Sequence, residues 1–89
     1  TVLTELRLGG NKRIGPAGAL ALAEMLKVNT MLRKLWLGGC GVGDKGVRHL
    51  AAALRVNETL ETLNLDINGI THLGAVELAA ALPVKRTLR

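Results

Sequence analysis

The stretch Leu60–Leu82, LETLNLDINGITHLGAVELAAAL, is the clearest of three copies of one pattern. It aligns with Leu32–Leu54, LRKLWLGGCGVGDKGVRHLAAAL, which begins 28 residues earlier. A first copy begins at Leu3 and is one residue longer, because Lys12 and Arg13 stand where the other copies have a single residue. The chain is therefore built from one repeated unit of 28–29 residues.

The period of the apolar residues changes inside each copy. Leucines alternate with other residues in the L-x-L segments, which is the period of a half-buried strand. The later Leu-Ala-x-x-Leu segments, such as Leu50, Ala51 and Leu54, have helical spacing. We expect short strands near 5–8, 34–37 and 62–65, and helices near 16–27, 44–55 and 72–82.

Residues suited to helix starts precede each predicted helix. Pro16 stands at the first predicted helical position, where its missing N–H does no harm. Asp44 and Thr71 carry oxygens that can accept hydrogen bonds from the unpaired N–H groups of a helix start. We therefore expect each of these two side chains to serve the helix that it begins.

The shared pattern L-x-x-L-x-L-x-x-[NC]-x-[IV]-x-x-x-G-x-x-x-L-A-x-x-L resembles the leucine-rich repeat of the ribonuclease-inhibitor type. The resemblance covers essentially the whole chain. It implies an α/β leucine-rich-repeat solenoid, a horseshoe with a parallel inner sheet and outer helices. Leu88 matches Leu60, so a fourth copy begins. We expect repeats at about 1–28, 29–56 and 57–84, with a further one starting at 85–89, as a segment of a longer array.

The fold implied by the resemblance assigns structural roles to the recurring residues. The alternating leucines point into the core: Leu6, Leu8, Leu35, Leu37, Leu63 and Leu65. Three glycines allow neighbouring repeats to approach closely, namely Gly18, Gly46 and Gly74. The resemblance also implies that Asn11 and Asn68 bind backbone groups in the turn after the strand, and that Cys40 takes this place in the middle copy.

Two local motifs have a structural explanation within the repeat. The segment Gly41–Gly46 reads G-x-G-x-x-G, the form of a dinucleotide-binding loop, but the equivalent segments of the other copies lack this triplet. Asn57-Glu-Thr59 is an acceptor sequence for N-glycosylation that coincides with the joint between repeats. We interpret both motifs as parts of the repeat.

The sequence shows no pattern that indicates catalysis. His49 and His72 belong to different copies, and no Cys/His/Asp cluster has the spacing of metal ligands. No nucleophile stands in a recognisable pairing with a base. We predict no catalytic, cofactor-binding or metal site, so the chain is not an enzyme.

Composition bounds the location and the partner. The single cysteine, Cys40, cannot form an internal disulfide, which favours a reducing compartment, the cytosol or the nucleus, and of these we expect the cytoplasm. No apolar run approaches the roughly 18 residues of a membrane span. Three of the 12 Lys and Arg residues behind the net charge of +5 lie in the last five positions, which leaves nine against seven Asp and Glu. We expect a protein partner, and not nucleic acid, a membrane or a small-molecule substrate.

The residues that alternate with the core leucines should face outward from the concave surface of the sheet. They form three rows: Glu5, Lys34 and Thr62; Arg7, Trp36 and Asn64; Gly9, Gly38 and Asp66. Trp36, the only aromatic residue, lies at the centre, and Trp and Arg are enriched in binding hot spots. The predicted partner-binding residues are Trp36, Arg7, Lys34, Asn64, Asp66, Glu5 and Thr62. Two alternatives would make these residues less available to a partner: neighbouring side chains shield Trp36, or Arg7 lies over its ring in a cation–π contact.

The sequence favours a non-enzymatic scaffold for protein–protein interaction. Family resemblance leaves two alternatives open, a regulator of a small GTPase similar to Ran GTPase-activating protein and the sensing module of a NOD-like receptor. Scaffolding in a cytoskeletal or ciliary assembly is a further setting. Nucleic-acid binding would predict an affinity that falls steeply with salt. Ribonuclease inhibition is disfavoured, because that family member is acidic and cysteine-rich and this chain is neither.

Overall fold

A computed structural model of the chain describes the backbone of residues 3–81 and 87–88 and the side chains of residues 3–81. Strands and helices alternate in the order β1 (Glu5–Arg7), α1 (Gly15–Val28), β2 (Lys34–Trp36), α2 (Gly43–Leu54), β3 (Thr62–Asn64), α3 (His72–Ala81) and β4 (Thr87–Leu88). Each predicted strand and helix is present, with bounds within one residue of those expected. Residue 82, the predicted end of the third helix, lies outside the described residues.

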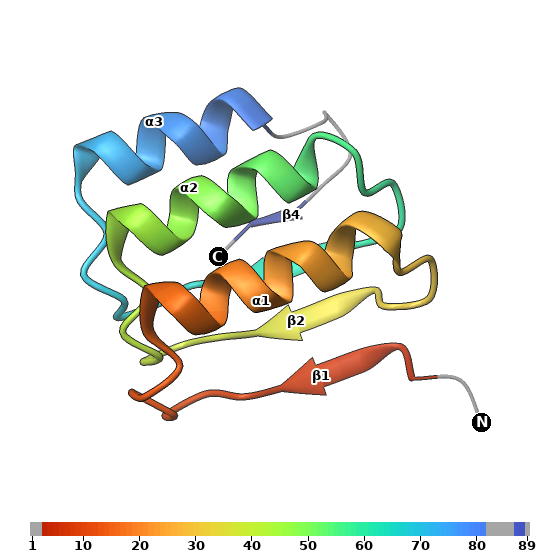
Figure 1. Ribbon diagram of the computed structural model, residues 1–89, viewed down its shortest axis with the longest axis horizontal. Helices are drawn as coiled ribbons and strands as arrows, with labels where there is room; N and C mark the ends of the chain where they lie inside the picture. Colours follow the sequence, from red (N-terminus) through yellow and green to blue (C-terminus); the bar gives the residue numbers. More distant parts are fainter. Residues whose placement is uncertain (1–2, 82–86, 89) are drawn as a thin grey trace.

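The strands form one parallel sheet, and the helices form a second layer over one of its faces (Figure 1). The order of the strands in the sheet follows the chain, β1-β2-β3-β4. Parallel neighbours need a crossover connection, and here each crossover is the helix of the same repeat. α2 packs against both α1 and α3. This arrangement confirms the predicted α/β solenoid of about three repeats.

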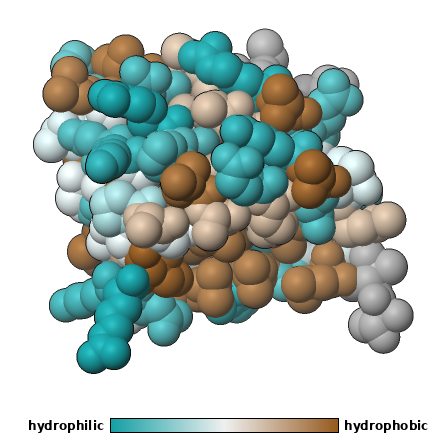
Figure 2. Space-filling model, in the orientation of Figure 1, coloured by the Kyte–Doolittle hydropathy of each residue, from teal (hydrophilic) through white to brown (hydrophobic). Residues whose placement is uncertain are grey.

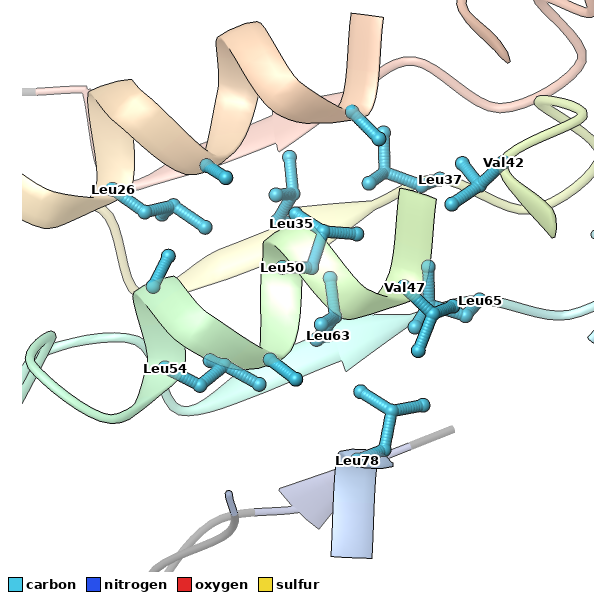
Figure 3. Close-up of a cluster of buried hydrophobic side chains, with 14 of the residues drawn as sticks. Leu26, Leu35, Leu37, Val42, Val47, Leu50, Leu54, Leu63, Leu65 and Leu78 are labelled. Carbon is cyan, nitrogen blue, oxygen red and sulfur yellow. The ribbon is translucent and has the colours of Figure 1, made fainter. Parts of the chain in front are cut away.

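The core lies between the two layers and is built from residues at equivalent positions of the repeats. Leu35 and Leu63 are partners in the sheet register and are at most 2 % exposed. Figure 3 shows them meeting Leu50 of α2 between the layers. Full burial of a leucine side chain stabilises a fold by about 1.5–3 kcal/mol, so such positions dominate stability. Leu6 and Leu8, also predicted to lie in the core, are only partly buried, because β1 is an edge strand.

Gly46 allows α2 to approach α1 closely. A Cβ atom at this position would lie 3.0 Å from Ala19 Cβ and 3.3 Å from Pro16 Cα, both in α1. The backbone of Pro16 cannot give way without a shift of the whole helix, so a larger residue would force the two repeats apart. The predicted packing role of this glycine is therefore confirmed.

Asn68 ties the third repeat to the second through its buried amide group, which is 5 % exposed. Its Oδ1 accepts hydrogen bonds from the N–H groups of Cys40 and Val42, at 2.9 and 3.1 Å. Its Nδ2 donates to the carbonyl oxygens of Leu37 and Asp66, at 2.8 and 3.2 Å. The role implied for this asparagine, binding backbone groups in the turn after the strand, is confirmed.

The equivalent residues of the other repeats serve the same turn. Asn11 is exposed, and its Nδ2 donates to the carbonyl oxygen of Leu8 at 2.6 Å. Cys40 is fully buried, and its thiol donates to the same carbonyl group at 3.1 Å. Cys40 is thus a structural residue enclosed by the repeats.

Asn57 explains the glycosylation-like motif at the joint between repeats. The residue is 4 % exposed, and its Nδ2 donates to the carbonyl oxygens of Leu26 and Asn29, at 2.7 and 3.1 Å. Its Oδ1 accepts hydrogen bonds from the N–H groups of Thr59 and Leu60. The nitrogen that would carry a glycan belongs to this buried side chain and donates two hydrogen bonds to the backbone, so the motif has a structural role in the folded chain.

Asp44 lies in the first turn of α2, as expected, but it does not cap that helix. The residue before α2 is Val42, and no side chain caps this helix. Asp44 instead accepts hydrogen bonds from the N–H group of Thr71, at 2.8 Å, and from its hydroxyl group. Stacked helices place this carboxylate at the start of α3, where N–H groups lack partners. Thr71 does serve its own helix, since its Oγ1 accepts from the N–H group of Leu73 at 3.3 Å.

The last strand differs in register from the sequence match. The spacing of 28 residues sets Leu88 level with Leu60, but β4 pairs Leu88 with Leu63 and Thr87 with Thr62. A strand of two residues makes few backbone hydrogen bonds, so its register is weakly specified. Residues 85 and 86, the predicted start of the further repeat, lie outside the described residues.

Candidate functional site

The parallel register assembles the predicted rows on one face of the sheet. Glu5 pairs with Lys34, and Lys34 pairs with Thr62. Arg7 pairs with Trp36, and Trp36 pairs with Asn64. The core leucines of the same strands, such as Leu35, are buried toward the helices, so the alternating residues face away from them. The predicted neighbours therefore lie side by side on the concave face.

The third predicted row, Gly9, Gly38 and Asp66, follows the strands, and backbone hydrogen bonds between neighbouring repeats continue there. The N–H group of Gly10 donates to the carbonyl oxygen of Gly38 at 2.8 Å. The N–H group of Gly39 donates to the carbonyl oxygen of Asp66, also at 2.8 Å. These bonds keep Gly38 level with Asp66, as the repeat alignment predicts.

Trp36 is held by the side chains of the neighbouring repeat. Its indole Nε1 donates a hydrogen bond to Glu5 Oε2 at 2.6 Å. The guanidinium group of Arg7 donates to the same oxygen through Nε, at 2.9 Å, and forms an ion pair with it at 2.8 Å. The guanidinium carbon of Arg7 lies 5.2 Å from the centroid of the Trp36 ring. Trp36 is half-buried, so both possibilities from the sequence hold: neighbours partly shield the ring, and Arg7 lies over it.

The charge of Glu5 is stabilised by this arrangement. The hydrogen bond from the Trp36 indole, and then the charge and hydrogen bond of Arg7, lower the pKa of Glu5 below its ordinary value of 4.5. The charge of Lys34, across the sheet, lowers it further. Because the charged carboxylate of Glu5 accepts hydrogen bonds from both Trp36 and Arg7, it fixes the positions of these two side chains.

Asn64 and Asp66 form a second, smaller group on the same face. Asn64 Nδ2 donates to Asp66 Oδ2 at 3.3 Å, and the N–H group of Asp66 donates to Asn64 Oδ1 at 3.2 Å. Lys34 is exposed and Thr62 is half-buried. The structure thus brings all seven predicted residues onto one face. Hydrogen bonds and ion pairs between their side chains occur only within two groups, one of Glu5, Arg7 and Trp36 and one of Asn64 and Asp66.

The role of Glu5 is the feature that sequence reasoning missed. The sequence identified it as one position of the grid, whereas it is the residue to which both Trp36 and Arg7 bind. Cross-strand neighbours on one face interact in pairs and diagonally, so an acid opposite Lys34 and diagonal to Trp36 was the available signal. An ion pair between repeats, Arg33 to Glu61 at 2.6 Å, was also unforeseen.

Other parts of the described chain offer weaker candidates. The N–H groups of Gly43 and Gly46, in the G-x-G-x-x-G segment, donate to backbone carbonyl oxygens and do not point at an open site. Within residues 3–81, no three His, Cys, Asp or Glu residues gather as metal ligands would. No described helix is long and apolar enough to cross a membrane.

A groove lies between the starts of α2 and α3. Its lining residues are Asp44, Arg48, His72, Leu73, Gly74, Val76 and Glu77. The hydrogen bonds from the side chain and backbone of Thr71 lower the pKa of Asp44, which is therefore occupied in joining the two repeats. The groove is formed by the stacking of helices, and the concave face remains the stronger candidate.

Comparisons with known proteins agree with this architecture. A family model described as Leucine Rich repeat matches residues 1–23, 28–51 and 56–79. No curated protein matches the chain. A solved structure of leiomodin-1 actin-binding site 2 is similar, with a TM-score of 0.88 and 28 % identity over 96 % of this chain and 50 % of that one. The tropomodulin C-terminal domain of Caenorhabditis elegans has the same fold, with a TM-score of 0.82 and 21 % identity over 97 % of this chain and 52 % of that one.

The chain thus spans about half the length of each of these two structures. The matched ranges of the family model cover most of the 89 residues and coincide with the three copies found in the sequence. The chain belongs to the leucine-rich repeat family.

Proposed function

We propose that the chain is a non-enzymatic protein-interaction module that binds a protein partner on its concave face. The observation that carries the proposal is the group formed by Glu5, Arg7 and Trp36. It places the only tryptophan and an arginine, two residue types enriched in binding hot spots, together on an open sheet. The same face carries Lys34, Asn64, Asp66 and Thr62, which we assign to polar contacts.

The proposed mechanism is presentation of a pre-organised surface. The hydrogen bond from Trp36 to Glu5 holds the ring in one orientation before a partner arrives. The side chain of Arg7 is bonded to the same carboxylate, yet it is 73 % exposed, so its outer face stays available for contact. Side chains that are already ordered lose less conformational entropy on binding, which favours affinity.

For the partner we propose actin. The support is the similarity to leiomodin-1 actin-binding site 2, at 28 % identity over nearly the whole of this chain. The similarity to leiomodin-1 favours this partner over a small GTPase or a receptor-sensing role. Both structures extend beyond the region that this chain matches. Actin binding by a longer protein that contains this chain is therefore proposed as well.

Two finer assignments belong to the same proposal. The subclass is the ribonuclease-inhibitor type, supported by the repeat of 28–29 residues and by Asn68 and Cys40 at its turn position. The location is the cytoplasm, supported by a single cysteine that is buried and unpaired with another.

A binding experiment with purified actin tests the proposal. Surface-immobilised actin is titrated with the chain, and saturable binding is expected. The variant Trp36→Ala should weaken it, whereas Leu20→Ala, on α1, should not. Failure to bind would reject actin as the partner. Binding that survives Trp36→Ala in a folded variant would reject the concave face as the site.

A further inference from the structure

We infer that the partner presents an extended segment in which an acidic, a large apolar and a basic side chain occupy alternate positions. These three side chains contact Lys34, Trp36 and Asp66, respectively. The inference rests on the proposed function, because it specifies the chemistry of the protein that the concave face binds. It follows from which charges on that face are paired and from their spacing.

The four charged residues that the concave face carries within residues 3–81 are not equivalent. Glu5 and Arg7 neutralise each other through an ion pair of 2.8 Å. Among the described residues, no ion pair reaches Lys34 or Asp66. Asp66 receives a hydrogen bond from the uncharged amide of Asn64, at 3.3 Å, which leaves its charge uncompensated. One cation and one anion therefore remain for a partner to neutralise.

These two charges stand on either side of Trp36 along the strand direction. Lys34 and Trp36 are two residues apart on β2, so they share a face. Asp66 is level with Gly38, because the ladder that pairs Trp36 with Asn64 continues to the bond between Gly39 and Asp66. Along the strand direction the three groups thus follow one another at intervals of two residues, about 6.6 Å each, with Asp66 one strand to the side of Lys34 and Trp36.

Asp66 is exposed, so its carboxylate is accessible to a partner side chain. Gly38, level with it on β2, carries no side chain, and Asn64 Oδ1 lies 3.1 Å from where a Cβ atom of residue 38 would stand.

An extended chain has the same period as the sheet beneath it. Its side chains at i, i+2 and i+4 point the same way and are spaced about 6.6 Å apart. Charge complementarity assigns an acid opposite Lys34 and a base opposite Asp66, and the ring of Trp36 assigns an apolar side chain between them. Either chain direction satisfies this order.

Three blocked peptides test the inference: Gly-Glu-Ser-Leu-Ser-Lys-Gly, its counterpart with two glutamates, and its counterpart with two lysines. None contains an aromatic residue, so the fluorescence of the single tryptophan, Trp36, reports binding directly. The mixed-charge peptide should bind about threefold more tightly than either like-charged peptide, which is the effect of one exposed ion pair.

Charge-reversal variants of the chain sharpen the test. Lys34→Glu should change the preference to the lysine–lysine peptide, and Asp66→Lys should change it to the glutamate–glutamate peptide. Lys45→Glu, on the exposed surface of α2, is the matched control and should leave the preference as it is. Unchanged melting temperatures show that each variant folds.

Equal affinities for the three peptides, no saturable binding of any, or preferences that Lys34→Glu and Asp66→Lys leave unchanged would overturn the inference. The proposed function is judged separately by actin binding and Trp36→Ala. Loss of actin binding in Trp36→Ala together with equal peptide affinities would reject the segment chemistry alone.

Discussion

The indole nitrogen of Trp36 donates a 2.6 Å hydrogen bond to Glu5 in the preceding repeat, and Arg7 binds the same carboxylate oxygen. The central residue of the concave face is therefore positioned by a residue 31 places earlier in the chain. Neither repeat alone contains this arrangement, so the candidate site exists only when the repeats stack.

Acidification should release Trp36 from Glu5. The indole hydrogen bond and Arg7 lower the pKa of Glu5 below 4.5, so this contact stabilises the fold above pH 4.5 and is lost as the pH falls through the lowered value. The NMR shift of the Trp36 indole proton should stay constant above pH 4.5 and change only below it. Glu5→Gln should remove this transition. A transition centred above pH 4.5 would show that Glu5 is not stabilised in this way.

Asp44→Asn should loosen the joint between α2 and α3. The hydrogen bonds from Thr71 lower the pKa of Asp44 below its ordinary value of 3.8, so the charged form contributes stability above pH 3.8 that is lost at lower pH. The variant should melt at a lower temperature than the wild type at pH 7, and the difference should shrink at acidic pH, as followed by circular dichroism. A constant difference at all pH values would argue against a role for the charge.

Asn68→Ala should destabilise the chain by about 3 kcal/mol, because it leaves three buried backbone groups of the second repeat without partners. The repeat-equivalent variant Asn11→Ala is the control. It removes one exposed hydrogen bond, so it should cost about 1 kcal/mol or less. Urea denaturation measures both. Equal costs would mean that burial does not distinguish the two asparagines.

Ile67→Gly should stabilise the fold. Ile67 has a φ of +55° and is 90 % exposed, whereas the equivalent residues, Gly10 and Gly39, are glycines. A left-handed backbone costs an L-residue roughly 1–2 kcal/mol, and the added freedom of glycine in the unfolded chain offsets about 0.5–1 kcal/mol of that. A net gain of about 0.5–1 kcal/mol is expected in urea denaturation. The reciprocal variant Gly39→Ile should be destabilised, and a stabilised Gly39→Ile would refute the strain argument.

Periodicity was sufficient to predict the strands and helices, and the resemblance to the leucine-rich repeat implied how they stack. The L-x-L and Leu-Ala-x-x-Leu spacings located the strands and helices within one residue, because alternation and helical spacing decide which side of the backbone is buried. The same logic predicted which residues would be neighbours on the concave face, and the register of Arg7 with Trp36 and of Trp36 with Asn64 confirms it.

Side-chain partners between repeats were less accessible to sequence reasoning. Asp44 was expected to serve its own helix, but close stacking brings it to Thr71 of the next repeat. Glu5 was one grid position among nine. Its place diagonal to Trp36 was available from the spacing, but the hydrogen bond between them also depends on side-chain rotamers, which spacing does not specify. The short β4 pairs Leu88 with Leu63 and not with Leu60, since two residues cannot fix a register.

The most direct test of the central claim is the affinity of the folded chain for actin before and after removal of the Trp36 ring. Trp36→Ala should raise the Kd by roughly 30-fold, the loss of about 2 kcal/mol typical of a hot spot. Arg7→Ala, which removes an exposed side chain, should also raise it, while Leu20→Ala should not. Unchanged affinity for actin in both Trp36→Ala and Arg7→Ala, with melting curves that show intact folds, would contradict the account.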